Sequence, residues 1–408
     1  MIDDLATVDR TTAEPIEAVH RRLRGFLDRH RPPTPCLVVD LPAVGAGYRR
    51  LRELFPAADL YYAVKANPAH EVLRLLAGLG ASFDVASPVE VELCLRAGAH
   101  PDRLSYGNTV KKRSDVARAH ALGVRLFTVD SEPDLVNVAA AAPGADVLCR
   151  IFAEPPASST PFGRKFGCDP ELAGPLLRRA ARLGLRPRGL SFHVGTQQLD
   201  PGAWEHGIAT AARLAAELAA SGIPLTALDL GGGFPAGYRD GAPPLAEYAA
   251  AIEASLDRHF GAARPALAIE PGRSVVADAG ILRSEVVLVS RKAYHHAHRW
   301  VYLDVGRHNG LTETEDEFIA YDLLTAHDGG PTGPVVLAGP TCDGDDVLYE
   351  RTTYHLPVDL APGDHVDVLA AGAYTASCAT VGFNGFAPLP THHIGADGEP
   401  VDGCGHGG

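Results

Sequence analysis

Amine, imidazole, carboxylate and guanidinium side chains follow short apolar runs along the first two thirds of the sequence. Lys65 follows LYYAV, Asp84 lies within SFDVAS, and Arg150 ends DVLCR. Further along, His193 lies in SFHVGT and Glu270 lies in AIEPGR. Because the carboxyl ends of parallel strands meet on one face of a barrel, we expect these side chains to converge. Together they suit a cofactor that carries an aldehyde.

Lys65 is the candidate nucleophilic amine. The end of an apolar strand partly desolvates a lysine, which lowers its pKa and raises the neutral fraction that attacks an aldehyde. The alternative is a lysine that merely reaches solvent from the barrel rim. The remaining lysines lie in polar loops or on helix faces: Lys111, Lys112, Lys165 and Lys292.

Glu270 and His193 each have two interpretations from sequence alone. Glu270 suits the nitrogen of a pyridinium ring, which it would keep protonated so that the ring accepts electrons. An ordinary ion pair with Arg273 fits the same motif. His193 suits one face of a cofactor ring, although an isolated histidine near a strand end is commonly only hydrogen-bonded.

The LGGGFP segment places Gly231, Gly232 and Gly233 directly after an apolar run. A glycine backbone approaches a phosphate closely and offers its N–H groups to it. Three glycines also occur where a chain merely turns tightly between a strand and a helix. Arg273 and Tyr374 are candidates for further phosphate ligands.

A thiol and a carboxylate are adjacent in the GPTCDGDD segment, at Cys342 and Asp343. This pair suits proton transfer and recognition of a cationic side chain. A simple turn containing a free cysteine is the alternative, because Asp-Gly is a strong turn signal.

The elements that position these residues alternate between apolar runs and helical patterns. Eight strands with eight helices over roughly 230 residues fit a TIM (β/α)8 barrel, and a doubly wound parallel sheet is the main rival. The eight apolar runs are Leu60–Val64, Ser82–Ala86, Arg103–Tyr106, Arg125–Val129, Asp146–Ile151, Gly189–Val194, Leu225–Leu230 and Ala266–Ile269.

The character of the sequence changes after about residue 280, where β-rich runs alternate with Gly, Pro and Asp. We therefore predict an α/β barrel over residues 40–280 and an all-β, Greek-key-like domain over 281–394. The N-terminal segment 1–39 would join the β domain. Residues 395–408 would form a mobile, glycine-rich tail.

Composition excludes several classes of protein. The net charge of −13 opposes binding to nucleic acid, and the sequence has no apolar stretch long enough to span a membrane. The N-terminus lacks the features of a secretory signal, so we expect a cytoplasmic protein. Seven scattered cysteines without CxxC spacing argue against disulfides and against a metal site.

Seven motifs in order resemble one family. YYAVKAN, FDVASPVEVE, FHVGTQ, LDLGGGFP, EPGR, GPTCDGDD and GAYT span residues 61–386. This series resembles the fold-type III decarboxylases of ornithine, lysine and diaminopimelate, which depend on pyridoxal 5′-phosphate. GPTCDG and the later VGFNGF are more similar to ornithine or lysine/ornithine decarboxylases.

The resemblance implies a role for each candidate residue. Lys65 would form the Schiff base, Glu270 would partner the pyridinium nitrogen, and His193 would stack on the ring. Cys342 would return a proton in place of the lost carboxylate. Asp84 and Arg150 would support the lysine and the cofactor, and the phosphate would be held by Thr196, Gly233, Gly272, Arg273 and Tyr374.

The resemblance also implies a substrate and an assembly. Asp343 would bind the distal ammonium, with Asp322 as a second acidic residue, which favours L-ornithine or L-lysine as substrate. Diaminopimelate or a specialised amino acid is the alternative, because loop 153–167 departs from the family's patterns. The β domain would complete the site of a second subunit, so activity would require a homodimer.

Three other functions are compatible with parts of the pattern. An amino-acid racemase shares the barrel and the lysine, but usually pairs the ring nitrogen with Arg rather than with an acid such as Glu270. A non-catalytic regulatory homologue would typically lack the lysine or the phosphate cradle. A barrel enzyme that uses Cys342 without a cofactor would leave Gly231–Gly233 unexplained.

Overall fold

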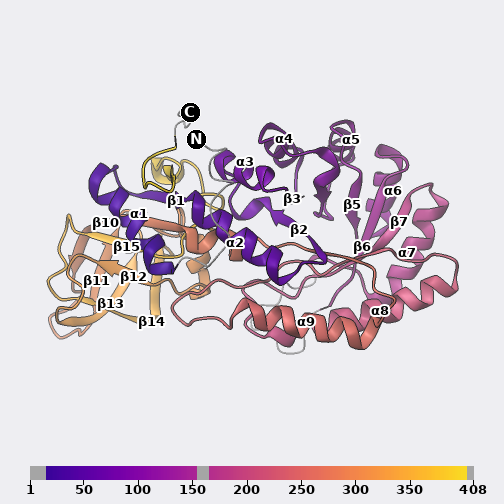
Figure 1. The fold of residues 1–408 in the computed structure, drawn as a ribbon. Helices are drawn as coiled ribbons and strands as arrows, with labels where there is room; N and C mark the ends of the chain where they lie inside the picture. Colours follow the sequence, from indigo (N-terminus) through magenta and orange to yellow (C-terminus); the bar gives the residue numbers. More distant parts are fainter. Residues whose placement is uncertain (1–14, 154–164, 402–408) are drawn as a thin grey trace. The chain divides into compact units, whose positions relative to one another are not determined.

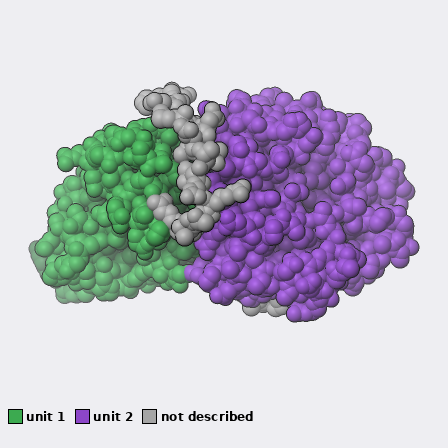
Figure 2. All heavy atoms as spheres, viewed as in Figure 1, with its two compact units in different colours: residues 1–47, 236–241, 275–408 green, residues 48–235, 242–274 purple. Residues whose placement is uncertain are grey.

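A computed structural model of the chain describes residues 15–153 and 165–401. The chain divides into two compact units, which Figure 2 shows in different colours. The barrel unit consists of Tyr48–Pro235 and Ala242–Ser274. The β unit consists of the chain up to Gly47, Ala236–Gly241, and the chain from Val275 onward. The β unit is therefore assembled from three separate segments of the sequence.

The barrel unit contains a closed barrel of eight parallel strands with helices around it (Figure 1). The barrel closes where β2 pairs with β9, with Leu60 opposite Ile269. Each strand overlaps one of the eight predicted runs, so the TIM-barrel prediction is confirmed and the doubly wound alternative is wrong. The strands are β2 (Ala58–Ala63), β3 (Ser82–Val85), β4 (Leu104–Tyr106), β5 (Leu126–Val129), β6 (Asp146–Arg150), β7 (Arg186–Ser191), β8 (Ala227–Asp229) and β9 (Ala266–Ile269).

The helices of the barrel have one buried face, as their apolar periodicity predicted. In α8 the buried residues include Ile208, Ala211 and Leu218, which lie on the same side of the helix. At the start of α4, the Ser87 hydroxyl accepts the N–H of Glu90 and caps the helix. The helices are α2 (Leu41–Leu54), α3 (His70–Gly78), α4 (Pro88–Arg96), α5 (Arg113–Ala121), α6 (Glu132–Ala141), α7 (Pro170–Arg182), α8 (Trp204–Ala220), α9 (Leu245–Phe260) and α10 (Arg273–Val276).

The β unit is built on an eight-stranded sheet, in which β12, β15, β10, β11, β13 and β14 are successive neighbours. β10 also pairs with β1, which in turn pairs with β16. Most pairs are antiparallel, but β11 with β13 and β1 with β16 are parallel. The strands are β1 (Cys36–Asp40), β10 (Gly280–Ser290), β11 (Arg299–Leu303), β12 (Leu323–Thr325), β13 (Thr332–Ala338), β14 (Val347–Pro357), β15 (His365–Val368) and β16 (Thr391–Ile394).

The segment before β1 forms a helix, α1 (Ile16–His30), which the sequence reading did not predict. Its residues Leu23 and Phe26 are buried in a cluster with Val38 of β1, Ile281 of β10 and Ile394 of β16. The antiparallel-rich sheet confirms the predicted β domain, and α1 from the N-terminal segment packs on this sheet. The apolar face of α1 has to pack on the sheet because an isolated helix of this length is only marginally stable in water.

Two predicted features, loop 153–167 and the tail 395–408, lie at the edges of the described residues. Residues 154–164, most of loop 153–167, lie outside them, as do residues 402–408 of the predicted tail. Residues 395–401 form a turn in which Gly395 N–H donates to the carbonyl of Glu399 at 3.0 Å. The side chain of Arg29 on α1 donates to that glutamate's carboxylate at 2.9 Å.

Two kinds of feature are absent from residues 15–153 and 165–401. None of their helices combines the length and the apolar character needed to cross a lipid bilayer. They contain no group of three or more His, Cys, Asp or Glu side chains arranged to hold a metal ion.

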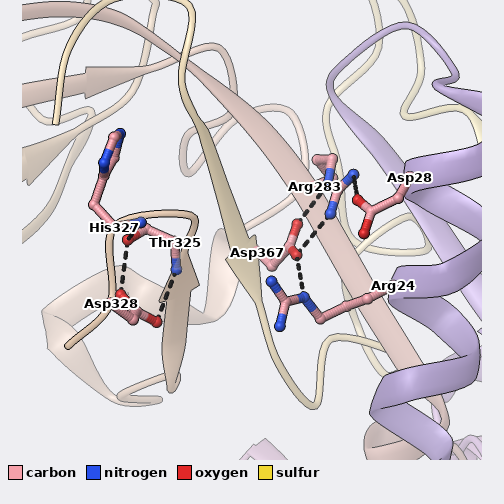
Figure 3. Close-up of polar contacts among 7 residues, drawn as sticks. All are labelled: Arg24, Asp28, Arg283, Thr325, His327, Asp328 and Asp367. Atoms are coloured by element: carbon pink, nitrogen blue, oxygen red, sulfur yellow. Dashed lines mark hydrogen bonds and ion pairs between the residues drawn. The ribbon is translucent and has the colours of Figure 1, made fainter.

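A buried ion-pair network fixes α1 to the sheet of the β unit (Figure 3). Arg283 on β10 donates to both carboxylate oxygens of Asp367 on β15, at 2.6 and 2.9 Å. From α1, Asp28 accepts from Arg283 at 2.9 Å and Arg24 donates to Asp367 at 3.2 Å. The side chains of Arg283 and Asp367 are only 8% and 4% exposed. A buried charge of this kind depends on its partners to offset the loss of hydration.

We expect Asp367→Ala to lower the free energy of unfolding by about 3–5 kcal/mol, because it leaves a buried guanidinium without its bidentate partner. Glu399→Ala is the matched control, since it removes an exposed ion pair with Arg29 and should cost about 0–1 kcal/mol. Urea denaturation followed by circular dichroism measures both. Equal losses in the two variants would contradict the role of the network.

Candidate active site

Lys65 lies at the mouth of the barrel, in the single 3-10 turn Val64–Ala66 that directly follows β2. Its Nζ donates a hydrogen bond of 2.9 Å to Oδ2 of Asp84, on the neighbouring strand β3. The lysine side chain is 47% exposed, which is more than its position after an apolar strand led us to expect. The amine is therefore held in place by a carboxylate and is accessible to a small molecule.

Gly107, which follows β4, allows two carboxylates to approach the same point. A Cβ atom on this residue would lie 3.4 Å from Oε1 of Glu270 and closer to Oδ1 of Asp84 than real Cβ atoms approach. Glycine is required here by space rather than by backbone conformation. Asp84, which is bonded to Lys65, and Glu270 therefore border one small volume at the barrel mouth.

Glu270 follows β9 and is hydrogen-bonded to the side chain of Asp229, the last residue of β8. Burial raises the pKa of Glu270 well above its ordinary range, and the neighbouring carboxylates of Asp229 and Asp84 raise it further. The cations Lys65 and Arg150 oppose this shift without reversing it. A carboxyl group in this environment holds a proton at neutral pH.

Asp229 is buried, and burial raises its pKa to about 6. Its Oδ1 accepts the N–H of Gly231 at 2.9 Å, which favours the ionised form of this carboxylate. We therefore place the proton of the pair on Glu270 and the negative charge on Asp229. Two interacting acids of this kind titrate together rather than independently.

His193 follows β7 and is held as a neutral imidazole. Its Nδ1 accepts the N–H of Gly195 at 3.0 Å, which leaves Nε2 to carry the proton. Burial lowers the pKa of His193 well below its usual value, and the cations Arg150 and Lys65 lower it further. Nε2 points toward Gly232, where a Cβ atom would lie 3.1 Å from it.

The glycine run after β8 packs against its neighbours so closely that side chains do not fit. A Cβ atom on Gly232 would lie 2.7 Å from the carbonyl oxygen of Glu270, and one on Gly233 would lie 2.5 Å from that of Gly195. Gly231 and Gly233 have φ values of 68° and 106°, which favour glycine. The run is therefore more than a tight turn, because it brings bare backbone to the barrel mouth.

The other candidates of the barrel unit also lie at strand ends. Arg150 is the last residue of β6, and its guanidinium carbon lies 5.2 Å from the centre of the Phe166 ring. Thr196 lies in the loop that follows β7. Gly272 precedes Arg273, a buried residue that begins α10.

The barrel mouth fits a cofactor with an aldehyde, a ring nitrogen and a phosphate. Oδ1 of Asp84 is buried without a hydrogen-bond partner in the described residues, so the mouth has an unused polar atom beside the lysine. The amine is accessible, the acid pair holds a proton for a ring nitrogen, and the glycine run excludes side chains from the mouth. The amine suits the aldehyde of pyridoxal 5′-phosphate, the acid pair suits its ring nitrogen, and the glycine backbone suits its phosphate.

Cys342, Asp343, Asp322 and Tyr374 belong to the β unit. The exposed Cys342 is held through its backbone N–H, which donates to the side-chain oxygen of Asn384 at 3.0 Å. Asp322 is exposed, and its carboxylate lies near His20 and Tyr354. Tyr374 has a positive φ of 57°, which is unusual for a side chain of this size.

The loop that carries Cys342 and Asp343 is fixed by the buried carboxylate of Asp346. Oδ1 of Asp346 accepts the N–H of Arg307 at 2.8 Å, and Oδ2 accepts the hydroxyl of Thr341 at 2.6 Å. Cβ atoms on Gly306 or Gly339 would collide with this carboxylate. One buried acid thus joins two loops of the β unit and sets the course of the 339–346 segment.

Three residues of these sites were missed by the sequence reading: Asp229, Gly107 and His308, whose imidazole is hydrogen-bonded to Asp343. Asp229 had a signal, because a carboxylate between Leu228 and Leu230 on a short strand faces the opposite side from its apolar neighbours. Gly107 and His308 had none, since their roles depend on residues distant in sequence.

Comparison with known proteins gives consistent matches over most of the chain. The family model described as pyridoxal-dependent decarboxylase, pyridoxal binding domain, matches residues 42–277. Lysine/ornithine decarboxylase of Selenomonas ruminantium is 38% identical over 364 residues, 88% of this chain and 90% of that protein. Antizyme inhibitor 2 of Xenopus laevis is 33% identical over 372 residues, 87% of this chain and 80% of that protein. A crystal structure of lysine/ornithine decarboxylase from Vibrio vulnificus, complexed with cadaverine, superposes with a TM-score of 0.82 at 32% identity, covering 94% of this chain and 100% of that one.

We expect Gly107→Ala to weaken the binding of pyridoxal 5′-phosphate by about ten- to a hundred-fold, because the added methyl group displaces Asp84 from Lys65. Titration of the cofactor-free protein, followed by absorbance, measures the change. Gly78→Ala is the control, since a Cβ atom there meets nothing within 4 Å. Unchanged affinity in Gly107→Ala would show that the close approach of Asp84 and Glu270 has no part in the site.

Proposed function

This chain belongs to the fold-type III pyridoxal-dependent decarboxylases, and we propose that its substrate is a basic diamino acid, L-ornithine or L-lysine. It is a carboxy-lyase whose cofactor is pyridoxal 5′-phosphate. The named activities of its lysine/ornithine and ornithine decarboxylase relatives support a basic amino acid as substrate. The product would be carbon dioxide and the corresponding diamine.

The observation that carries the proposal is the convergence of an accessible amine and a protonated acid pair at one barrel mouth. When bound, the cofactor supplies an aldehyde for an amine and a ring that accepts the electrons left by the lost carboxylate. Lys65 would bind the aldehyde, and Glu270 would hold a proton at the ring nitrogen. His193, neutral and oriented by Gly195, would lie against the ring.

The remaining barrel residues would orient the cofactor. Asp84 would hold the Lys65 amine in position through their 2.9 Å hydrogen bond, and Arg150 would balance the carboxylates of the mouth. We propose that the phosphate is bound by Thr196, Gly231, Gly232, Gly233, Gly272, Arg273 and Tyr374. Backbone N–H groups in a glycine run and a buried arginine are suited to a dianionic phosphate.

The β unit would recognise and protonate the substrate. Asp343, whose pKa is lowered chiefly by the N–H of Asp345, is an ionised carboxylate suited to a distal ammonium, and Asp322 would add a second negative charge. The exposed thiol of Cys342 would donate the proton that replaces the carboxylate. We propose that these residues act on the barrel of a second subunit, so that a homodimer is the active form.

Lys65→Ala should abolish carbon dioxide release from the preferred amino acid, because Lys65 is the amine that we propose binds the aldehyde of the cofactor. The purified variant should also lack the visible absorbance band that borohydride removes from the wild-type protein. Lys112→Ala, which changes an exposed lysine of the same unit, should retain both properties. A Lys65→Ala protein that keeps the band would locate the cofactor elsewhere.

Mixing inactive chains tests the shared site. Lys65→Ala and Cys342→Ala chains, unfolded and refolded together, should recover about a quarter of wild-type activity, because half of the dimers are mixed and each has one intact site. Asp343→Ala should complement Lys65→Ala in the same way. Activity that stays at the level of the separate variants would refute sharing.

The substrate class is tested by measuring carbon dioxide release from a panel of amino acids under saturating cofactor. L-Ornithine and L-lysine should give the highest kcat/KM, and diaminopimelate a lower value, because its distal carboxylate would meet Asp343. If ornithine and lysine both release no carbon dioxide, the assignment to simple diamino acids is wrong.

A further inference from the structure

The carboxylate of Asp343 is paired with an imidazole from another loop of the β unit. Nε2 of His308 lies 3.0 Å from Oδ2 of Asp343, and the two side chains are 26% and 35% exposed. His308 precedes the short 3-10 segment Thr312–Glu317, 35 residues before Asp343 in the chain. Both partners are therefore reachable by solvent while they remain in contact.

The position of His308 is fixed from two sides. Its ring lies against the ring of Phe383, with 4.6 Å between their centres. Its backbone carbonyl accepts both the N–H and the hydroxyl of Thr380, at 2.8 and 2.6 Å. The imidazole is thus held at Asp343 by contacts that do not depend on the carboxylate itself.

Other charged groups near the pair define its electrostatics. The second oxygen of Asp343 accepts the N–H of Asp345 at 3.1 Å. Arg307 adds positive charge, and its guanidinium donates to the carbonyl of Asp345 at 2.9 Å. The carboxylate of Asp346 is engaged with the backbone N–H of Arg307. Among these groups, His308 is the one whose side-chain type changes charge near neutral pH.

We propose that His308 is a positioning residue that orients Asp343 for the distal cation of the substrate and makes this recognition dependent on pH. The proposal rests on the proposed function. A neutral imidazole donates one hydrogen bond to Asp343 and leaves its negative charge for an ammonium group. A protonated imidazole neutralises that charge and competes with the ammonium.

The effect belongs to substrate binding rather than to the bond that breaks. The distal ammonium lies at the far end of the substrate from the α-carboxylate, so its recognition is the same in the bound substrate and in the transition state. A contact that is equally strong in the bound substrate and in the transition state contributes only to binding, so its loss raises KM and leaves kcat unchanged. Acidification should therefore raise KM in the wild-type enzyme through His308, with little change in kcat from this group.

The test compares His308→Gln with the wild-type holoenzyme between pH 8 and pH 6. Glutamine keeps an N–H donor at a similar reach but does not change its charge. Wild-type KM for the preferred diamino acid should rise about five-fold on acidification, and this rise should disappear in His308→Gln. His327→Gln is the matched control, because His327 pairs with Asp364 at 3.1 Å in the same unit and should leave the wild-type pH profile in place.

A binding measurement separates this proposal from the proposed function. Calorimetric titration of the holoenzyme with 1,5-diaminopentane should show affinity that falls on acidification, whereas pentylamine, which lacks the distal amine, should show no such additional loss. Failure to release carbon dioxide from any basic amino acid would remove the proposed function and leave this titration intact. The role of His308 would be overturned if the affinities for the two ligands depended equally on pH. It would also be overturned if wild type and His308→Gln had the same pH dependence, or if the diamine did not bind.

Discussion

The ion pair between Lys65 and Asp84 is the contact on which the arrangement of the barrel mouth depends. It joins the ends of β2 and β3 and fixes an otherwise flexible amine at one point. Gly107, at the end of the next strand, leaves the space in which the second oxygen of Asp84 lies, and Glu270 borders the same space from β9. A reactive amine is useful only where its orientation is settled beforehand, and here adjacent strands of a closed barrel provide that orientation.

The charges of the mouth are arranged so that their burial is tolerated. Three carboxylates, those of Asp84, Asp229 and Glu270, lie with the cations Lys65 and Arg150. One proton on the acid pair leaves two negative charges facing two positive ones, and the nearby imidazole stays neutral. A single unpaired charge at this depth would be costly, whereas pairing and hydrogen bonds offset part of the cost of burial. The same arrangement keeps an acid protonated at neutral pH.

The sequence was sufficient for the features that depend on local pattern. Apolar runs at regular intervals predicted every strand of the barrel, and the residue after each run placed Lys65 and Glu270 at its mouth. It was insufficient where a residue's importance comes from a distant neighbour. Gly107 matters because of two carboxylates on other strands, and His308 because of a loop 35 residues away. Helix α1 was missed because its apolar face is stabilised by a sheet formed much later in the chain. The role of Asp229 could have been predicted, because this carboxylate lies between Leu228 and Leu230 in a short apolar run.

The buried carboxylate of Asp346 fixes the backbone of the 339–346 loop, whereas Cys342 and Asp343 are the side chains that this loop displays. It sets the backbone through Arg307 and Thr341, and bare backbone at Gly306 and Gly339 leaves room for it. The side chains of Cys342 and Asp343 take no part in the bonds that Asp346 makes. Point substitutions of Cys342 or Asp343 can therefore change the groups that this loop displays while the contacts of Asp346 persist. The groups that we propose recognise the substrate can thus diversify by single mutations, without loss of the fold that supports them.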